Sequence, residues 1–510
     1  MAKSRTEKIA TNITFHIAME LIKLICGLVL PRLILSNYGS AYNGIVQSVS
    51  QFISVIAIMK MGIAGATRVA LFKPLANKDY DEISEVLAST EMFMRKIALI
   101  FLVFVFVFAC IYPIWISTEF DWLFSFSLVL IISISTFAEY YFGFTYEALL
   151  NADQRDYIYN ILSIVTIILN TIVSVVLINA NCSIHVVKLG SAFANVVTPI
   201  GLYIYCHKHY QIKKIKHPKM SKIPDRWQAF AHEIASFVND NTDIMILTVF
   251  TNLLEVSVYT VYHYVTSNLK KIITSFTSSF GAAFGDMYAK GEMDLMNTNL
   301  RIYELIVYSF VSVIYSTTMV MIIPFVLVYT KGVNDVSYYR LGFAIVATLA
   351  GAFDCFRYPY KQIITNTGFF RQTKPFAIAE ACMNLIISIL TVRKFGLIGV
   401  SVGTLITMMF GAIAYSTYVC LKIVKRNPVH TYIHIGITLL TVFVVYRISL
   451  LYMGNISNYI EWLIYAVITG IISLIITVIV DFVLYREDFM KTLDKIFKVL
   501  LKKKGKKANA

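Results

Sequence analysis

The feature that most constrains this chain is a run of about 20 mainly apolar residues that recurs along nearly the whole sequence. A helix of this length crosses the hydrocarbon core of a bilayer. Strands of a membrane barrel would alternate apolar and polar residues over about ten positions, and segments such as 97–108 and 468–480 show no such alternation. We therefore predict an all-α polytopic membrane protein with about fourteen transmembrane helices. The predicted spans are 11–35, 42–69, 94–117, 122–149, 158–179, 184–206, 228–250, 256–280, 303–329, 338–366, 375–392, 396–421, 431–452 and 459–485.

The composition agrees with this prediction. The 510 residues are 57% hydrophobic and 15% charged, whereas a soluble protein of this size needs a far more polar surface. Residues 1–10 are polar and basic, and the apolar run that follows is longer than the apolar region of a secretory signal peptide. We expect this run to be the first transmembrane helix and expect no cleavable signal peptide.

Lysine and arginine are distributed unevenly over the connections between the predicted spans. With the N-terminus inside, seven of them lie in 207–227 and nine after residue 485, whereas the outside connections hold only Lys331, Arg393 and Lys394. Cytoplasmic connections carry the excess of positive charge in membrane proteins, so both termini are predicted to be cytoplasmic. The same asymmetry accounts for the net charge of +15 without a nucleic-acid partner. The 207–227 cluster is primarily a topology signal, with contact to anionic lipids as the alternative.

Several motif matches carry no chemistry. Gly399-Val-Ser401-Val-Gly403 fits the esterase pattern, but it lies in a predicted transmembrane helix, where small residues four apart favour helix packing. Asp79-Tyr-Asp81 lies in a predicted loop of about 25 residues with no nucleotide-binding pattern around it, and no Walker A sequence is present. The seven cysteines are scattered and form no C-x-x-C pair. We therefore expect no catalytic residues, no metal and no cofactor, and hence no enzyme.

The two halves of the chain resemble each other at a shift of about 214 residues. The matches are Phe142 with Phe356, Tyr146 with Tyr360, Asn170 with Asn384, and Ser174 with Ser388. Both halves start inside, so the repeat is parallel, and repeats of this kind commonly flank a substrate site near the middle of the membrane. We predict two six-helix lobes around a central cavity (1–215 and 216–428), an extra helix pair (429–485) and a basic amphipathic cytoplasmic tail (486–510).

Ionisable residues inside the predicted spans indicate where that cavity lies. Each is costly in hydrocarbon, so each should face a cavity or a partner. Mid-depth cations in the first two helices of each lobe and in the tenth span suit an anionic substrate such as a phosphate ester. The candidate substrate-binding cations are Lys23, Lys60, Lys270, Lys271 and Arg357. Lys270 and Lys271 point in directions about 100° apart on a helix, so we expect only one of them to face the cavity.

The acidic residues allow two interpretations. Glu20 with Lys23, and Asp354 with Arg357, stand three apart on one helix face and can be structural ion pairs. Alternatively, a buried carboxyl group can carry a proton through a transport cycle. The candidates for coupling or ion pairing are Glu20, Asp240, Asp243 and Asp354.

Several stretches of the sequence resemble polysaccharide flippases. They are Leu30-Pro-Arg-Leu-Ile-Leu-Ser-Asn-Tyr-Gly39, Asn43-Gly-Ile-Val-Gln-Ser48, Met61-Gly-Ile-Ala-Gly65, Leu71-Phe-Lys-Pro-Leu75, Asn239-Asp-Asn-Thr-Asp243 and Val256-Ser-Val-Tyr259. The resemblance is to the Wzx-type polysaccharide transporter branch of the multidrug/oligosaccharidyl-lipid/polysaccharide exporter superfamily, and it extends over essentially the whole chain.

The resemblance implies both an activity and a set of residues. The activity is translocation of an oligosaccharide linked to undecaprenyl pyrophosphate, from the cytoplasmic to the outer leaflet of the bacterial cytoplasmic membrane. Related flippases place cations of the first, second and eighth spans in the central cavity, where this sequence has Lys23, Lys60 and Lys270 or Lys271. Arg32 matches an arginine that we expect to hold the outer end of the first span.

Two rival functions remain open. A cation-coupled small-molecule exporter of the same superfamily usually has twelve spans. A membrane polymerase or ligase for lipid-linked glycans would need a long external loop, and no outside connection is long enough. The expected partners of a flippase are the lipid-linked oligosaccharide, membrane lipids, and a polysaccharide polymerase with other assembly proteins. We expect a monomer.

Overall fold

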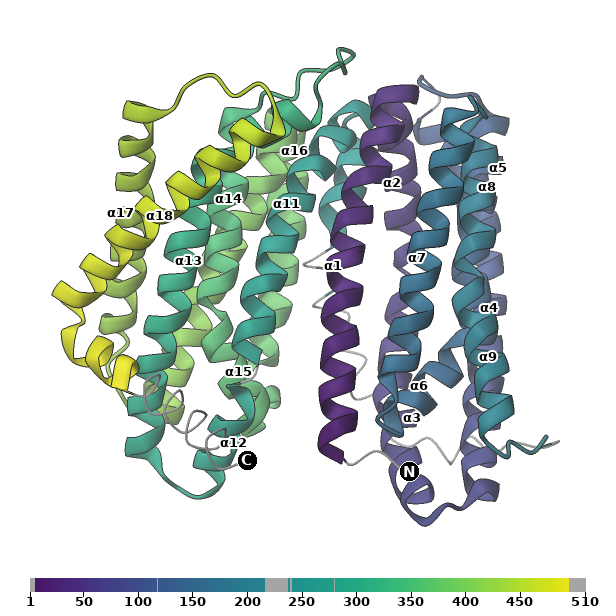
Figure 1. The fold of residues 1–510 in the computed structure, drawn as a ribbon, viewed down its shortest axis with the longest axis horizontal. Coiled ribbons are helices and arrows are strands. Elements are labelled where there is room, and N and C mark those ends of the chain that lie inside the picture. The colour runs from purple at the N-terminus through teal and green to yellow at the C-terminus, as the bar shows by residue number, and fades with distance from the viewer. Residues whose placement is uncertain (1–4, 117, 216–236, 239–240, 279, 495–510) are drawn as a thin grey trace. The chain divides into compact units, whose positions relative to one another are not determined.

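The chain is built of helices, and the structure has no strand in residues 5–116, 118–215, 237–238, 241–278 and 280–494, which are the residues it describes (Figure 1). It is a computed structural model. In those ranges, ten helices are long and apolar enough to cross a membrane. One of them, Phe370–Val424, has 55 residues, which is enough for two crossings, and Gly396 breaks it with φ 52° and ψ −129°.

The remaining predicted spans also fall on helices. Span 42–69 coincides with α2 (Ser40–Ser54) and α3 (Ala57–Asn77), and span 256–280 with α11 (Leu253–Ser278). The described end of span 228–250 coincides with the helix Asn241–Phe250. The all-α, multi-pass membrane architecture is therefore confirmed.

The described residues form two compact units. Unit 1 comprises 1–258 and 332–336, and unit 2 comprises 259–331 and 337–510. The lobe boundaries predicted from the repeat remain predictions.

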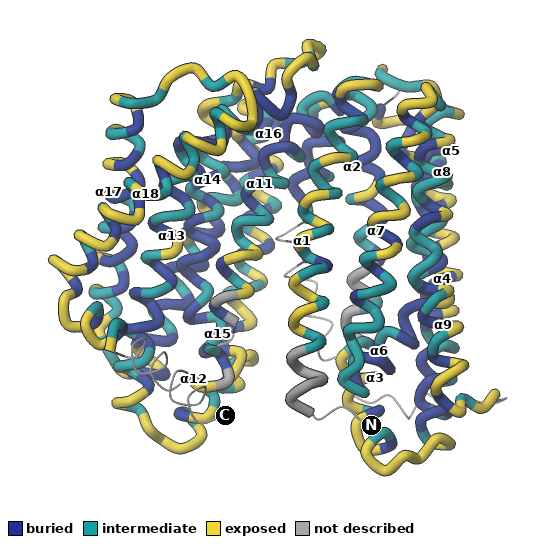
Figure 2. Tube along the Cα trace, viewed as in Figure 1, coloured by how far each residue is buried: buried dark blue, intermediate teal, exposed yellow. Residues whose placement is uncertain are grey.

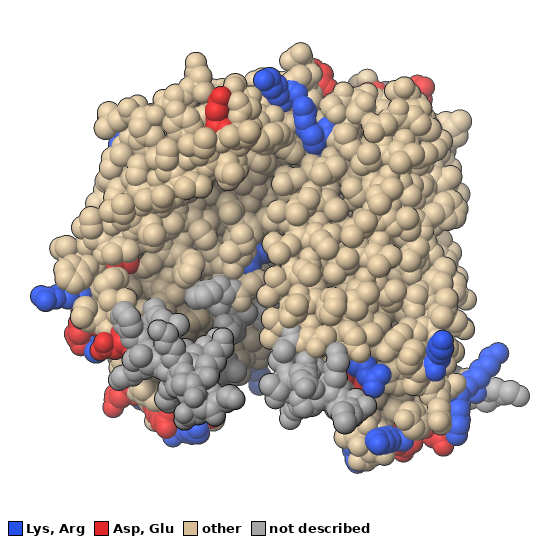
Figure 3. All heavy atoms as spheres, in the orientation of Figure 1, with Lys and Arg blue, Asp and Glu red and all other residues tan. Residues whose placement is uncertain are grey.

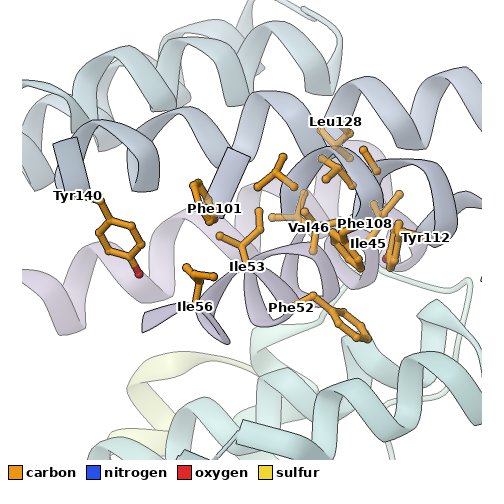
Figure 4. Packing of buried hydrophobic residues seen from close by; sticks show 14 of the residues in the cluster. Ile45, Val46, Phe52, Ile53, Ile56, Phe101, Phe108, Tyr112, Leu128 and Tyr140 are labelled. Atoms are coloured by element: carbon orange, nitrogen blue, oxygen red, sulfur yellow. The ribbon is translucent and has the colours of Figure 1, made fainter. Parts of the chain in front are cut away.

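Unit 1 is a bundle in which α1 packs against α7, α4 against α5, and both α5 and α7 against α8. Besides α2 and α3, its elements are α1 (Arg5–Tyr38), α4 (Tyr80–Trp115), α5 (Trp122–Ala138), the π-helix η1 (Glu139–Gly143), α6 (Phe144–Ala152), α7 (Asp156–Asn179), α8 (Ile184–Asn195) and α9 (Val197–His209). Aromatic side chains of α2 and α4 fill its main core, where the rings of Phe52 and Phe108 stack with centroids 5.0 Å apart (Figure 4).

One face of α2 is bonded to the segment 241–258 by small polar side chains. The Asn43 amide donates to the Ser257 hydroxyl at 2.9 Å, and the Ser48 and Thr248 hydroxyls share a hydrogen bond of 2.8 Å. All four of these side chains are buried. Gly44 lies between them, directly against the Leu253 backbone. This is the close helix approach that small residues permit inside membranes.

Unit 2 is built around α13 (Met293–Tyr329), which packs against α14, α17 and α18. Its other elements are the main part of α11, α12 (Gly281–Ala289), α14 (Leu341–Phe356), α15 (Tyr358–Thr367), α16 (Phe370–Tyr418), the π-helix η3 (Val419–Val424), α17 (Val429–Tyr452) and α18 (Tyr459–Leu484). Fully buried tyrosines of α13, namely Tyr303, Tyr308 and Tyr315, lie in the core of this unit. The extra helix pair is thus packed onto α13.

The outer surface of both units is apolar. Exposed leucines and isoleucines run along α1, α4, α17 and α18, and Ile460 and Leu451 are 74% and 86% exposed (Figure 2). On the visible face of each unit, the middle carries few charges and most charged side chains gather toward the ends (Figure 3). An exposed apolar surface of this extent suits lipid and not water. The chain is therefore a multi-pass membrane protein.

The predicted amphipathic tail is described only at its start. After a break at Tyr485, residues 486–494 are helical and include Phe489 and Leu493. Residues 495–510, and part of the basic 207–227 cluster, lie outside the described residues.

Candidate functional site

A polar cavity of about 310 Å³ lies within unit 1. Its charged lining residues are Lys23 of α1, Glu139 of η1 and Glu147 of α6, and hydroxyl and amide groups supply much of the rest. The full lining is Met19, Lys23, Ser135, Thr136, Glu139, Gly143, Glu147, Tyr159, Ser163, Thr166, Ile167, Asn195, Thr198, Pro199 and Leu202. A hydrated, polar site inside a helix bundle is a typical place for a membrane transporter to handle a charged group.

A π-helix places Glu139 at this cavity. The helix of α5 changes to π geometry over Glu139–Gly143 and returns to α geometry at Phe144. Single π turns inside α-helices occur frequently at functional sites. The Glu139 carboxylate accepts a hydrogen bond from the Lys60 ammonium of α3, which also lies 5.7 Å from the centre of the Tyr140 ring. The ion pair with Glu139, which belongs to another helix, thus brings Lys60 to the site.

Lys23 is the exposed cation of the cavity. Its side chain is 58% exposed, and its Nζ lies 3.9 Å from Oε1 of Glu20, which is 38% exposed. The spacing of three residues therefore produces the ion pair that the sequence allows. Because exposed pairs of this length are weak, Glu20 holds the Lys23 ammonium only loosely.

A second cavity of about 220 Å³ lies beside the first and contains Lys188 of α8. Ser135, Thr136 and Asn195 line both cavities, so polar groups continue from one to the other within unit 1. Lys188 is not among the candidate site residues predicted from the sequence.

Unit 2 gathers its charges in a different way. The Arg357 guanidinium donates from Nε to Asp354 Oδ1 at 2.6 Å and from Nη1 to Glu380 Oε1 at 2.7 Å. Lys270 of α11 forms an ion pair with Asp354. Asp354, Arg357 and Glu380 are each less than 5% exposed. The predicted pair Asp354–Arg357 is therefore part of a larger buried network that joins α11, α14 and α16.

Two local features hold this network in place. The proline at position 359 has no N–H to donate to the carbonyl of Cys355, and the helix is interrupted at Arg357, between α14 and α15. Gly411 of α16 lies in direct contact with the Glu380 carboxylate. A side chain at position 411 would occupy the space of that carboxylate.

A second buried pair in unit 2 joins Glu304 of α13 to Arg426, which lies between η3 and α17. The hydroxyls of Tyr360 and Thr431 also donate to Glu304 Oε1. Burial lowers the pKa of the Arg426 guanidinium, but the Glu304 carboxylate raises it more, so its net pKa lies above the ordinary value. Arg426 and Glu304 are 122 positions apart, and nothing in the sequence around Arg426 indicates this distant partner.

The other predicted site residues are more scattered. Lys271 is exposed on α11, next to the half-buried Lys270. Asp243 is buried on the helix Asn241–Phe250, and Asp240 lies outside the described residues. The roles of all these residues in binding or coupling remain predictions, as does the central cavity.

Glu139, Glu380 and Glu304 are not among the candidate site residues predicted from the sequence. Glu139 and Glu147 are eight residues apart, so they lie near one face of a helix, and this spacing was a signal for the unit 1 cavity. The partners of Glu380 and Glu304 come from other helices, and sequence spacing carries no signal for them. In the described part of the chain, no group of three His, Cys, Asp or Glu side chains is arranged to hold a metal ion.

Comparison of the sequence with protein families and with curated proteins finds no match. Comparison with solved structures finds several similar proteins. The lipid II flippase MurJ, in an inward closed conformation, aligns with a TM-score of 0.73 at 16% identity, covering 93% of this chain and 99% of that chain.

Exporters of the MATE family align as well. An inward-facing multidrug resistance MATE transporter of the MOP superfamily gives a TM-score of 0.61 at 14% identity, covering 82% of this chain and 96% of that chain. A mutant of the Vibrio cholerae MATE transporter VcmN gives 0.54 at 13% identity, covering 82% of this chain and 99% of that one.

These likenesses show the fold. The protein has the fold of the transporters of the MOP superfamily, the multidrug/oligosaccharidyl-lipid/polysaccharide exporters. Its structural neighbours include a lipid II flippase, which aligns over 93% of this chain, and MATE exporters, which align over 82% of it.

Proposed function

We propose that this protein is a flippase that moves an oligosaccharide linked to undecaprenyl pyrophosphate across the bacterial cytoplasmic membrane, for the biosynthesis of a capsular, exopolysaccharide or O-antigen-type polymer. The observation that carries the proposal is the alignment with a lipid II flippase over 93% of this chain. The MATE exporter alignments given above cover 82% of it. The flippase therefore accounts for more of the chain than either exporter does.

The cations inside the membrane support an anionic substrate. Lys23 is exposed at a polar cavity, and Lys271 is exposed on α11. A pyrophosphate offers several acceptor oxygens, and charge-assisted hydrogen bonds to such oxygens are about twice as strong as neutral ones. We propose that Lys23, Lys60, Lys270, Lys271 and Arg357 bind this group at successive stages, with Lys60, Lys270 and Arg357 exchanging carboxylate partners for phosphate.

The proposed transport cycle is alternating access. The pyrophosphate neutralises the cations, the sugars cross through a hydrated path, and the lipid tail stays in the bilayer. Ion pairs such as Lys60–Glu139 keep the lysines compensated when no substrate is bound, because an unpaired charge inside the membrane is costly. Asp240, Asp243, Asp354 and Glu20 are the proposed coupling or ion-pair carboxylates.

The proposal includes the setting of the protein. Both termini lie in the cytoplasm, by the distribution of lysine and arginine. Its partners are the lipid-linked substrate, membrane lipids, and the polymerase and assembly proteins that receive the flipped unit. The protein acts as a monomer and is not an enzyme.

A cation-coupled exporter of small molecules is the second candidate function. The observation that favours it is the set of MATE alignments, of which the inward-facing structure reaches a TM-score of 0.61. Such a protein would expel cationic dyes and leave lipid-linked sugars in place.

A reconstitution experiment separates the two functions. The full-length protein is placed in liposomes that contain undecaprenyl pyrophosphate-linked oligosaccharide with a fluorescent sugar label, and the outer-leaflet fraction is followed by quenching. Ethidium efflux is measured in parallel vesicles. We expect lipid movement without dye efflux. Dye efflux without lipid movement would overturn the proposed function.

The substrate-binding residues are tested in the same vesicles. The double variant Lys270→Ala/Lys271→Ala should lower transport by about tenfold or more, because each charge-assisted hydrogen bond contributes about 1.5–3 kcal/mol. The variant should still fold, since Asp354 keeps Arg357 as a partner. Lys208→Ala, at an exposed lysine in the last turn of α9, is the control. Normal transport by the double variant would overturn the assignment of these lysines and leave the function standing.

A further inference from the structure

Lys188 differs from the paired lysines inside the membrane described above. It is the fifth residue of α8 (Ile184–Asn195), is half-buried, and lines the cavity of about 220 Å³ in unit 1. Lys60 and Lys270 each form an ion pair with a carboxylate from another helix. Within the ranges that the structure describes, Lys188 forms no ion pair and no hydrogen bond.

The lining of this cavity contains no carboxylate. It consists of Val46, Ser50, Ile53, Ile132, Ser135, Thr136, Lys188, Ser191, Ala192 and Asn195. The wall therefore offers hydroxyl and amide groups around a single ammonium. A lysine placed for structural neutralisation would be expected beside an acid, as the other two are.

Two further polar groups of the wall are also unused by the protein. The Thr136 hydroxyl of α5 and the Asn195 amide of α8 form no hydrogen bond with any part of the chain that the structure describes. The neighbouring Ser50 and Ser191 hydroxyls, in contrast, donate to Val46 and Asn170. Unused donors are thus concentrated around Lys188.

The positions of these groups on the helices converge. Lys188 and Asn195 are seven residues apart, which is almost two full turns, so they share one face of α8. Thr136 lies on α5, and α5 packs against α8. An ammonium, an amide N–H and a hydroxyl therefore border one small space from two packed helices.

An unpaired ammonium inside a membrane protein is costly and is compensated by a partner or by loss of its proton. A pocket lined with N–H and O–H donors and no acidic group favours the first solution with an anion as the partner. We propose that the Lys188 pocket is a binding site for a small monovalent anion of halide or carboxylate size. A pyrophosphate with its lipid and sugars is far larger than a space of about 220 Å³.

The anion can come from two sources. It can be a free anion such as chloride, or it can be the carboxylate of an acidic sugar in the transported glycan. The second source rests on the proposed function, whereas the first holds for any transporter with this fold.

The test uses the purified full-length protein in lipid nanodiscs. Its melting temperature is followed by tryptophan fluorescence while sodium chloride replaces sodium HEPES at constant sodium concentration. A ligand that binds only the folded state raises stability in a saturable way. We expect a saturable rise in melting temperature for the wild type. A second titration with sodium glucuronate distinguishes a free halide from a sugar carboxylate.

Two variants locate the effect. In Lys188→Met the rise should disappear, with affinity for chloride lowered about tenfold or more through loss of the charge-assisted hydrogen bond. Lys208→Met, which removes the same charge from the exposed end of α9, should respond like the wild type. Replacing an uncompensated buried charge by an apolar side chain is commonly tolerated, so Lys188→Met should fold.

A second variant keeps the test decisive if Lys188→Met does not fold. Asn195→Leu retains the charge and removes one donor, and it should shift the midpoint of the anion titration several-fold upward. If the wild type shows no saturable response to either anion, the proposal is wrong. It is equally wrong if Lys188→Met and Asn195→Leu respond like the wild type. Neither result would bear on lipid movement, which is measured separately.

Discussion

The two units use charge inside the membrane in different ways. In unit 1, Lys23, Glu139 and Glu147 line a polar cavity of about 310 Å³, and Lys23 is 58% exposed. In unit 2, Arg357 and Glu304 are 3% and 1% exposed and lie in ion-pair networks that join several helices. In this conformation, unit 1 therefore exposes charge at a cavity, whereas the buried charges of unit 2 join helices.

The difference shows that the number of ionisable residues in a span does not reveal their role. A charge near a hydrated cavity can change partners at low cost. A charge enclosed by protein is costly to separate from its partner, because removing one partner leaves the other buried and uncompensated. Three experiments test this contrast and the close packing of unit 1, beginning with the largest expected effect.

The buried pair of unit 2 should be the most sensitive point. Arg426→Met leaves the Glu304 carboxylate buried without its counter-ion. We expect a loss of stability of about 3–5 kcal/mol, measured as a lower melting temperature in nanodiscs. The double variant Glu304→Gln/Arg426→Met should recover most of the loss, since no uncompensated charge remains.

The matched control for this prediction is Lys422→Met. Lys422 lies on the same η3 segment but is exposed, so its removal should leave the melting temperature unchanged. An Arg426→Met protein as stable as the Lys422→Met protein would show that the enclosed pair does not hold α17 to α13, and the contrast between the units would fail.

The sequence predicted the helices well and the ion pairs only in part. Apolar runs indicate where helices cross the membrane, because the thickness of the hydrocarbon layer sets their length. The boundary between the predicted spans 375–392 and 396–421 coincides with the break at Gly396. Pairs three residues apart, such as Glu20–Lys23, were also predictable from helix geometry.

Partners from different helices were not predictable. Lys60–Glu139 and Lys270–Asp354 join residues that are 79 and 84 positions apart. Which helices are neighbours depends on tertiary packing, and a single sequence carries little of that information. For the same reason, the sequence did not indicate that Lys188 would lie in a cavity without an acid.

The contact between α2 and the segment 241–258 is the second test, because unit 1 also depends on close packing. A Cβ at Gly44 would overlap the Leu253 carbonyl oxygen and lie 2.7 Å from its carbon. Gly44→Ala should therefore destabilise the protein by about 1–3 kcal/mol. Gly65→Ala is the control: no atom lies within 4 Å of the added Cβ at this position of α3, and alanine in a helix should add about 0.5–1 kcal/mol. Equal melting temperatures for the two variants would contradict the close approach.

The smallest effect is expected at the exposed pair of unit 1. Glu20 and Lys23 have the same spacing of three residues as Asp354 and Arg357, so spacing alone does not distinguish the two pairs. Glu20→Gln should change stability by less than about 1 kcal/mol, because exposed ion pairs contribute little. Asp354→Asn, which disturbs a buried network with Lys270 and Arg357, should cost about 3–5 kcal/mol. Melting temperatures of both variants measured side by side decide the matter. If Glu20→Gln proved as damaging as Asp354→Asn, the first pair would be structural too, and Lys23 would no longer be available to a ligand.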